Sequence, residues 1–189
     1  MRRILAVHFG MNFPLRIIVL LALLAPPVMA AAADAPASFA AGPLTFTRPG
    51  EWIWVAQTSP MRKAELKVES ADKKQAAEVV FFHFGAGQGG GVQANVERWY
   101  GQFAEGRDKI NARSENKTVN GIKITYVFAE GTYLSGPPFG QKVPMKDHAL
   151  VGAIVEDPGG SVFVKMTGPK ELTKSAEPAF RKMVESARK

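Results

Sequence analysis

The chain contains no cysteine and only three histidines. The absence of cysteine excludes a disulfide framework, a thiolate metal site, a thiol nucleophile and a lipid-modified cysteine behind a leader segment. The histidines, His8, His83 and His148, stand far apart in the sequence and at no metal-ligand spacing such as HxxxH. We therefore expect no metal and no cofactor, and a fold that depends on its apolar core.

Catalytic signatures are also scarce. Asp147 and His148 are adjacent and could form part of an acid–base pair, but no serine in a nucleophile-elbow context accompanies them. His83 lies in an apolar run, where a hydrogen-bonded structural histidine is the commoner role. A catalytic pair of carboxylates on neighbouring strands stays an alternative, because one sequence does not reveal which strands are neighbours. The sequence thus favours a protein without catalytic residues and leaves the question of an enzyme open.

No apolar run is long enough to span a membrane. The longest, residues 17–25 (IIVLLALLA), has nine residues, whereas a spanning helix needs ~20. Arginines precede this run, a proline pair ends it, and a Val-Met-Ala sequence follows. This order is typical of a secretory signal peptide that is cleaved after Ala30, with Ala32 and Ala33 as alternative sites.

We expect residues 1–30 to be removed and the mature protein to be periplasmic or secreted, whether translation starts at Met1 or Met11. An uncleaved, membrane-tethered protein is the alternative. Because the leader carries three arginines and no acidic residue, its removal lowers the formal net charge from +7 to +4. A charge of that size supports solubility, and no basic tract interleaved with aromatics is present. We therefore expect no nucleic-acid partner, and membrane contact only through the leader.

The remaining sequence divides into a tail and one domain. Residues 31–43 are mostly small and lack periodicity, which predicts a linker or a disordered tail. Residues 44–189 predict a single domain. Short apolar or alternating runs bounded by turn residues predict strands over 44–47, 62–69, 77–84, 122–128, 149–156 and 161–167.

Three patterns describe these strands further. Lysines and glutamates alternate with apolar residues over 62–69 and predict a strand with one solvent-exposed face. The Asn-Gly pair at 120–121 is a tight-hairpin signal, and residues 157–160 join a second hairpin. Trp52 and Trp54 share one face of an extended segment, and one of them, or Phe139 in the loop over 134–148, could line a ligand groove.

Two helices are predicted. Apolar residues at spacings of four, three and four mark a helix over 92–103, with Trp99 on its buried stripe. Gly101 lies inside this helix, where another backbone should approach closely. A final helix is predicted to begin with Ser175 as its cap and Pro178 in its first turn. The order of strands, helix, hairpins and helix gives the fold class α+β, a mainly antiparallel sheet packed by two helices.

A glycine-rich stretch, residues 85–91, joins a predicted strand to the first helix. It matches the dinucleotide fingerprint GxGxxG. The hairpins that follow do not supply the parallel strand ending in an acid that this motif requires, so we expect no nicotinamide or flavin binding. The helix start at Val92 has no Ser, Thr, Asp or Asn cap, and its free N–H groups could hold a small anion. The candidate anion or ligand contacts are Gly87, Gln88, Gly89 and Gly90, and a tight or flexible turn is the alternative.

Residues 134–148 contain three prolines and predict a long loop. Loops of this length are uncommon in compact domains and are often functional. Leu134, Phe139, Val143 and Met145 give the loop an apolar character. Either these residues fold back and cover the sheet, or Phe139 and Met145 form part of a partner-binding patch.

The last pattern is a set of short segments spread over most of residues 50–187. They are Trp52, MRKA at 61–64, GQGG at 87–90, NVERW at 95–99 with Gln102-Phe103, GTY at 131–133, and GP at 168–169. Taken together, they resemble an uncharacterised family of small exported bacterial proteins. The resemblance implies no activity and adds no catalytic residue.

The order of elements is also similar to that of PsbP-like sandwiches, in which helices pack on an antiparallel sheet. PsbP-like proteins are exported or lumenal accessory factors without chemistry of their own. The missing catalytic constellation, the single domain and the long loop predict a non-catalytic binding or accessory domain of the cell envelope, and this similarity implies the same. Its partner would be an unknown envelope protein or a small ligand. The alternative function is a small-ligand or anion-binding protein, or an enzyme, that uses the glycine-rich loop 85–91.

Overall fold

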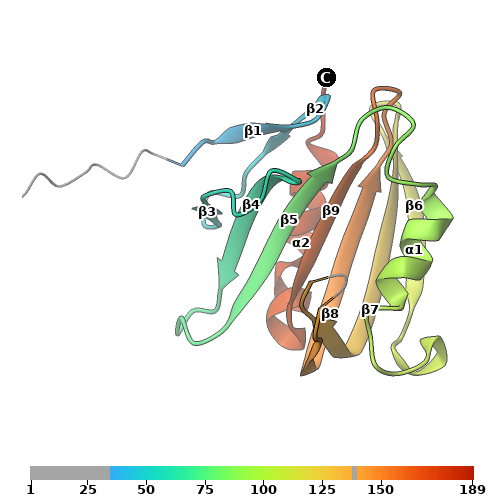
Figure 1. Cartoon of the computed structure of the whole chain (residues 1–189). Coiled ribbons are helices and arrows are strands. Elements are labelled where there is room, and N and C mark those ends of the chain that lie inside the picture. Colours follow the sequence, from blue (N-terminus) through green and yellow to red (C-terminus); the bar gives the residue numbers. More distant parts are fainter. Residues whose placement is uncertain (1–34, 138–139) are drawn as a thin grey trace, which may run out of the picture. The chain divides into compact units, whose positions relative to one another are not determined.

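The computed structural model describes residues 35–137 and 140–189. The predicted leader, residues 1–30, and Phe139 lie outside the described residues. In the part of the chain that is described, no helix is long and apolar enough to cross a membrane. The described elements, coloured along the chain in Figure 1, are β1 (Ser38–Ala41), β2 (Leu44–Thr47), β3 (Ile53–Val55), β4 (Arg62–Glu69), β5 (Ala76–His83), α1 (Val92–Tyr100), the 3-10 helix η1 (Arg107–Lys109), β6 (Arg113–Val119), β7 (Ile122–Ser135), β8 (Val143–Val155), β9 (Val162–Pro169) and α2 (Lys170–Glu185).

Seven strands form one sheet in the order β3-β4-β5-β9-β8-β7-β6, and β1 pairs with β2 in a separate hairpin. All neighbours in the large sheet are antiparallel. The predicted hairpin joins β6 to β7 through Asn120 and Gly121, which have φ angles of 50° and 78°. The prediction of an α+β fold with a mainly antiparallel sheet and two helices is confirmed.

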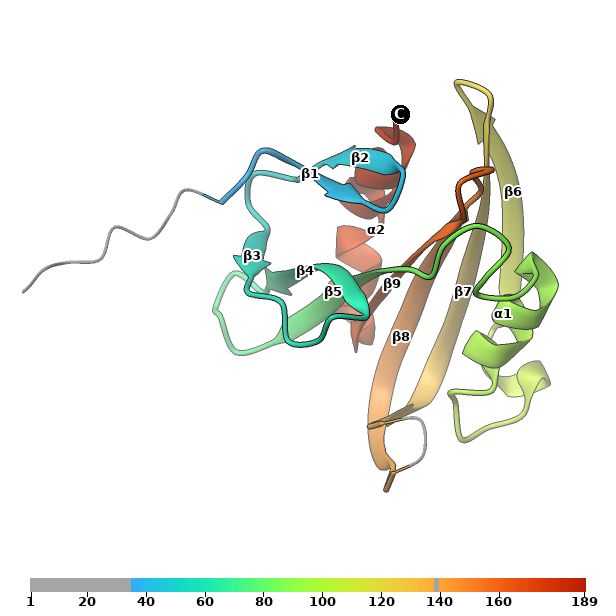
Figure 2. The same cartoon turned by 45° about the horizontal axis from the view of Figure 1, so that its top comes forward.

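The two helices lie on opposite faces of the sheet (Figure 2). α2 and the β1–β2 hairpin cover one face, which we call the α2 face, and α1 covers part of the other, the α1 face. Successive side chains of β7 point to opposite faces of the sheet and so contribute to both cores. Tyr126 and Phe128 join the core of the α2 face, whereas Val127 and Ala129 join the core of the α1 face. Each face therefore has an apolar core of its own.

The core of the α2 face is the larger of the two and is built around aromatic side chains. Phe46, Phe81 and Phe180 are fully buried. Phe46 meets Phe81 edge-on, with the ring centroids 5.1 Å apart. Burial of a side chain of this size contributes roughly 2–3 kcal/mol.

The β1–β2 hairpin corrects the prediction of a linker or disordered tail over 31–43. Residues 38–43 form β1 and the turn before β2. Phe39 and Ala41 belong to the α2-face core, and the rings of Phe39 and Phe81 have centroids 4.9 Å apart. The sequence gives little sign of this strand, because only two of its four side chains face the core.

β4 has the predicted bounds, but its predicted solvent-exposed face is wrong at one position. Glu65 is only 2% exposed, because the segment that holds Thr58 folds over it. The Glu65 carboxylate accepts hydrogen bonds from the N–H and hydroxyl of Thr58 at 2.7 and 2.8 Å, and it pairs with Arg62 at 2.9 Å. Burial works to raise the pKa of Glu65, but these partners outweigh it and lower the pKa below its usual value.

α1 is shorter than its apolar stripe predicts. It ends at Tyr100, and Gly101 forms its C-cap. The chain then leaves the helix, because residues 102–104 hydrogen-bond to one edge of β7. Trp99 lies on Gly152 of β8, where a Cβ atom would stand 2.2 Å from the ring. The backbone approach predicted at Gly101 is wrong for the described residues, because an added Cβ atom there would meet only the carbonyl oxygens of Glu97 and Arg98 in α1 itself.

The predicted start of the last helix is wrong. α2 begins directly after β9, with Pro169 as its N-cap residue. Ser175 does not cap the helix but donates from inside it to Leu172 O at 2.8 Å. Pro178 lies inside α2 at an exposed position, where its missing N–H interrupts the helical hydrogen bonds. The proline therefore marks the middle of the helix and not its first turn.

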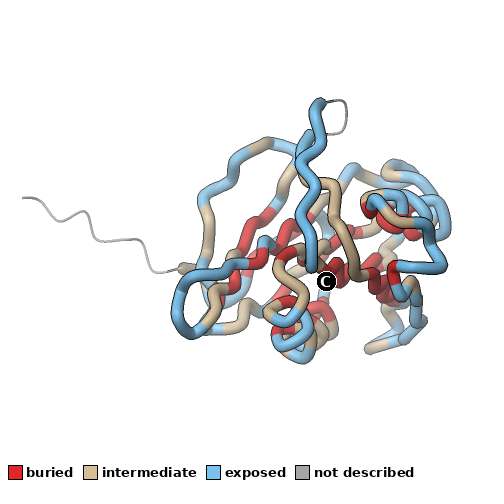
Figure 3. The backbone as a smooth tube through the Cα atoms, turned by 90° about the horizontal axis from the view of Figure 1, so that it is seen from below, coloured by how far each residue is buried: buried red, intermediate tan, exposed pale blue. Residues whose placement is uncertain are grey.

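The predicted loop over 134–148 is largely strand. β7 continues to Ser135 and β8 begins at Val143, and the two strands pair beyond the end of β9. We call residues 131–137 and 140–147 the arm. Figure 3 shows that the arm projects from the rest of the sheet. Its hydrogen bonds to residues 102–104, which follow α1, place it on the side of α1.

Pro144 is compatible with this strand for a geometric reason. Leu134, its partner across the arm, donates its N–H to Gln102 O at 2.8 Å, away from β8. Antiparallel partners alternate between hydrogen-bonded and non-hydrogen-bonded pairs, so Leu134 and Pro144 form a non-hydrogen-bonded pair. The ring nitrogen of Pro144 then faces the open edge of β8, where no N–H donor is required.

Candidate functional site

The base of the arm is held from both sides. On one side β7 pairs with β8, with Tyr133 opposite Met145. On the other side two main-chain hydrogen bonds of 2.8 and 2.9 Å join residues 102–104 to β7. Phe103 packs edge-on against Tyr133, with the ring centroids 5.6 Å apart. These contacts fix the direction in which the arm leaves the sheet.

Two apolar side chains of the arm are exposed. Val143 is 54% exposed and Met145 is 37% exposed. They lie two residues apart on β8, opposite Ser135 and Tyr133, so they share the side of the arm on which Tyr133 lies. Met145 is the candidate partner contact that the structure describes, and it has the exposure that such a contact requires.

A polar group lies where the arm meets the sheet. Lys165 of β9 directs its ammonium to Gln102 Oε1 and to Tyr133 Oη, both at 3.1 Å. The Tyr133 hydroxyl donates to Gln102 Oε1 at 3.0 Å, and the ammonium lies 5.7 Å from the centre of the Tyr133 ring. We call Gln102, Tyr133 and Lys165 the corner triad. Its position depends on the arm, so no sequence pattern indicates that these three residues meet.

The glycine-rich stretch lies at the other end of the sheet, where β5 leads into α1 (Figure 1). Gly87, Gly89 and Gly90 have φ angles of 70°, 87° and 81°, which favour glycine. Gln88 donates its N–H to Gly85 O at 3.2 Å. The stretch is therefore a series of tight turns, and it is separate from the arm.

Asn95 fastens this stretch to α1. Its buried amide donates to Gly89 O at 2.9 Å and to Gly91 O at 3.0 Å, and its Oδ1 accepts from Arg98 at 2.9 Å. The start of α1 has no side-chain cap. A helix start alone does not define a ligand, so the anion site at Gly87, Gln88, Gly89 and Gly90 stays a prediction.

The two described histidines bind main-chain carbonyls. His83 Nε2 lies 3.2 Å from Gly159 O, and its ring fills the space beside Gly42, where a Cβ atom would stand 2.4 Å from the ring. His148 Nδ1 lies 2.8 Å from Lys146 O. Across 35–137 and 140–189, no group of three or more histidine or acidic side chains is placed to hold a metal ion.

Trp52 and Trp54 both face the α2 side, as their spacing predicts. Trp52 is buried and lines a cavity of about 460 Å³ between the β4–β5 turn and α2. Trp54 packs against Phe39, with the ring centroids 5.2 Å apart. Of these two candidate groove residues, only Trp52 borders this cavity.

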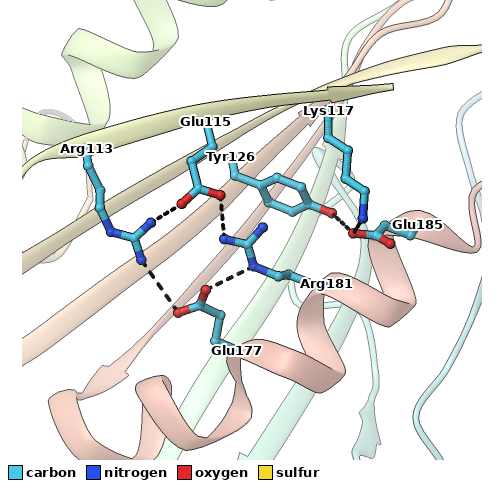
Figure 4. A network of polar contacts seen from close by, with 7 residues as sticks. All are labelled: Arg113, Glu115, Lys117, Tyr126, Glu177, Arg181 and Glu185. Carbon is cyan, nitrogen blue, oxygen red and sulfur yellow. Dashed lines mark hydrogen bonds and ion pairs between the residues drawn. The ribbon is translucent and has the colours of Figure 1, made fainter. Parts of the chain in front are cut away.

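One charged network among the described residues was not predicted. It joins β6 and β7 to α2 (Figure 4) and consists of Arg113, Glu115, Lys117, Tyr126, Glu177, Arg181 and Glu185. Arg181 lies 2.8 Å from Glu115 and 2.9 Å from Glu177. Its guanidinium lies 4.5 Å from the centre of the Tyr126 ring. The (i, i+4) pair Glu177–Arg181 is visible in the sequence, whereas the pairs between elements depend on how β6 lies against α2.

The electrostatics of this network indicate a structural role. Burial raises the pKa of the Tyr126 hydroxyl, and the negative charge of Glu185 raises it further. A hydrogen bond from Arg181 lowers the pKa of Glu115. Each described cation of the network has a carboxylate partner. The network therefore ties the edge strand β6 to α2.

Glu130 forms a second clamp near the start of α2. Its carboxylate lies 2.8 Å from Lys174 and 3.1 Å from Lys170, and it accepts a hydrogen bond of 2.7 Å from Asn111. Burial works to raise the pKa of Glu130, but these three partners outweigh it and lower the pKa to about 2. Glu130 and Phe128 border a cavity of about 260 Å³. The Glu130 carboxylate therefore links β7 to the start of α2 through two ion pairs.

Comparisons with known proteins give a similarity of fold. No family model matches the chain, and no curated protein matches it. The chain is similar to the solution structure of cyanobacterial PsbP (CyanoP) from Synechocystis sp. PCC 6803, with 12% sequence identity and a TM-score of 0.49. The match covers 86% of this chain and 99% of that chain. The resemblance to an uncharacterised exported family stays a prediction.

Proposed function

We propose that the protein is an exported, non-catalytic binding domain of the cell envelope and that its arm captures a partner protein. The observation that carries this proposal is the exposure of Val143 and Met145 on a ribbon held beyond the end of β9. Exposed apolar side chains that gather on one element are typical of protein–protein contacts.

The base of the arm suits this role. β8 and residues 102–104 bond to opposite edges of β7, so the arm is ordered before a partner arrives. An ordered surface loses less conformational entropy on binding, and more of the contact energy then appears as affinity. Pro144 removes a donor from the open edge of β8, which disfavours the addition of a partner strand there. Capture would therefore use the side chains of Val143 and Met145.

A photoreactive amino acid in place of Met145, or in a second variant in place of Val143, tests this function. In cells that export the full chain, irradiation should give a discrete covalent adduct with one envelope protein. Position 74, in the turn between β4 and β5, is the matched control, because the Lys74 side chain is 82% exposed and lies away from the arm. Adducts at neither 143 nor 145, or the same adducts at 74, would contradict the proposal.

Export is tested separately. Mass spectrometry of the protein from the envelope fraction should give an N-terminus between Ala31 and Asp34, because the leader ends in small residues there. An intact Met1 or Met11 on that protein would instead support a tethered form.

A further inference from the structure

Lys165 occupies an unusual place for a lysine. Its register partners are Val80 on β5 and Gly152 on β8. Val80 is buried, and Gly152 is covered by the ring of Trp99. The lysine stem thus rises from the sheet between apolar neighbours, and its ammonium reaches Gln102 and Tyr133 at the base of the arm.

Lys165 differs from the other half-buried lysines of the described residues in its charge partners. Three described lysines are half-buried: Lys67, Lys165 and Lys170. Lys67 pairs with Glu69 at 2.6 Å, and Lys170 pairs with Glu130 at 3.1 Å. Among residues 35–137 and 140–189, Lys165 is the half-buried lysine that has no carboxylate within 4.0 Å.

The acidic side chains of β4 and β5 already have cationic partners. Glu65 on β4 and Glu78 on β5 both pair with Arg62, at 2.9 and 2.5 Å. Lys165 instead contacts two neutral oxygens, and these occupy two of its three N–H donors. A charged donor held in a half-buried position with neutral acceptors retains its attraction for an anion, and a carboxylate would form a charge-assisted hydrogen bond there.

We propose that Lys165 binds a carboxylate of the partner that the arm captures. This inference rests on the proposed function. The partner would present an aspartate, a glutamate or its C-terminal carboxylate to Lys165, and an apolar side chain to Met145. The Tyr133 side chain joins the two contacts, because its Cα stands opposite Met145 and its hydroxyl meets the Lys165 ammonium.

The charges of the arm fit an acidic partner segment. Lys142 and Lys146 are exposed on it, with Asp147 as its described acid. The Lys142 ammonium is bound by Gly136 O at 3.2 Å and Pro137 O at 2.6 Å, which keeps its charge on the arm. A positive arm with a further ammonium at its base attracts acidic segments, and salt should weaken this attraction.

A zero-length cross-link tests the contact directly. The chain carrying the photoreactive residue at Met145 is treated with a water-soluble carbodiimide before irradiation. The carbodiimide first adds to a carboxyl group of the partner and gives an O-acylisourea. The deprotonated Lys165 amine then attacks the carbonyl carbon of this ester. An amide bond forms, and the reagent leaves as a urea that retains one carboxyl oxygen. Mass spectrometry of the photo-adduct should show the Lys165 peptide joined to an acidic or C-terminal peptide of the partner. A link from Lys165 only to Glu78 of the same chain would overturn the inference.

Substitutions give an independent readout. Lys165→Met keeps the apolar stem and removes the charge, and it should lower the yield of the Met145-position photo-adduct about tenfold at low salt. Lys165→Arg keeps the charge and should retain most of the yield. Lys123→Met, at an exposed position near the β6–β7 turn, is the matched control and should change nothing.

The outcomes separate the two proposals. An adduct at position 145 whose yield is the same in Lys165→Met, without any partner cross-link at Lys165, overturns this inference and leaves the proposed function standing. No adduct at position 143 or 145 in the parent chain overturns both. Thermal melting of each variant shows whether it is folded, so a loss of adduct in a folded Lys165→Met protein supports the carboxylate contact.

Discussion

Two partly buried cations, one on each face of the sheet, are held in different ways. On the α2 face, Arg181 lies over the Tyr126 ring and pairs with Glu115 and Glu177. On the α1 face, Lys165 lies beside the Tyr133 ring and meets only neutral oxygens. Both cations lie beside a tyrosine ring, but of the two only Arg181 pairs with carboxylates of the described residues.

This difference divides the work of the molecule between the faces. The α2 face combines the larger core with ion pairs that join α2 to β6 and β7, so it stabilises the fold. The α1 face has the smaller core, carries the arm, and leaves Lys165 without a carboxylate. A charge that the chain does not neutralise is available to a partner, whereas a satisfied network offers a partner little.

The largest effect is expected from truncation in the α2-face core. Phe180→Ala should lower the free energy of unfolding by ~4–5 kcal/mol, because a fully buried aromatic ring leaves a cavity beneath α2. Urea denaturation at pH 7 measures this loss. Val143→Ala on the exposed arm is the comparison and should stay within ~0.5 kcal/mol of the parent. Similar losses in both variants would remove the distinction between the faces.

Truncation in the α1-face core should have the next largest effect. Trp99 is 6% exposed and lies on Gly152, so Trp99→Ala should cost ~3–4 kcal/mol of unfolding free energy. The loss is expected to be smaller than for Phe180→Ala, because fewer apolar residues surround the ring. A change below ~1 kcal/mol in the same denaturation experiment would mean that α1 contributes little to the fold.

Trp99 also illustrates what the sequence could predict. Its helical spacing with Val92 and Val96 identified the buried side of α1, and strict alternation identified β4 with its correct bounds. Periodicity reports a face only where several turns or several strand residues repeat it. β1 is too short for that, and its sequence therefore resembled a tail.

The candidate site was harder to predict for a different reason. Met145 could be chosen from its apolar character, but three prolines made its segment resemble a loop, although Pro144 fits at an open strand edge. Lys165 gave no signal, because its contact with Tyr133 depends on the direction in which the arm leaves the sheet at Gly131, where the register shifts. Contacts between elements of this kind are set by tertiary packing and have no sequence period.

The pH dependence of the unfolding free energy should show how much the ion pairs between Glu130 and α2 stabilise the fold. Its folded pKa of about 2 lies below the ordinary value of 4.5. The resulting stabilisation is fully present above pH ~4.5 and is lost as the pH falls toward ~2. Glu130→Gln should therefore cost roughly 1–3 kcal/mol at pH 7, and the variant should lose less stability than the parent on acidification.

Unfolding measured by urea at pH 7 and at pH 3 tests this effect. The exposed Glu51→Gln serves as the control for removing one acid without breaking the clamp to α2. Equal losses of Glu130→Gln and Glu51→Gln at pH 7 would mean that Lys170 and Lys174 do not stabilise the ionised carboxylate.

A matched pair of substitutions compares the two cations themselves. Arg181→Met removes a cation with two carboxylate partners and an aromatic ring beneath it, and it should cost about 1–2 kcal/mol, less in 1 M salt. Lys165→Met removes a cation without a carboxylate partner and should change the unfolding free energy by no more than ~0.5 kcal/mol. A larger loss for Lys165→Met than for Arg181→Met would show that the corner triad, and not the network on α2, stabilises the chain.

The smallest effect on stability is expected from the outer part of the arm. Replacing residues 136–145 by a short Gly/Ser linker keeps Tyr133 against Phe103 and leaves both cores intact. The melting temperature should fall by less than ~2 °C, since the removed strand pairs bury little apolar surface. The same variant should no longer form an adduct from a photoreactive residue placed beside the linker, because Val143 and Met145 are gone. A large fall in melting temperature would instead assign residues 136–145 to the cover of the α1 face. That result would leave Lys165 as the feature of this face that still points to a partner.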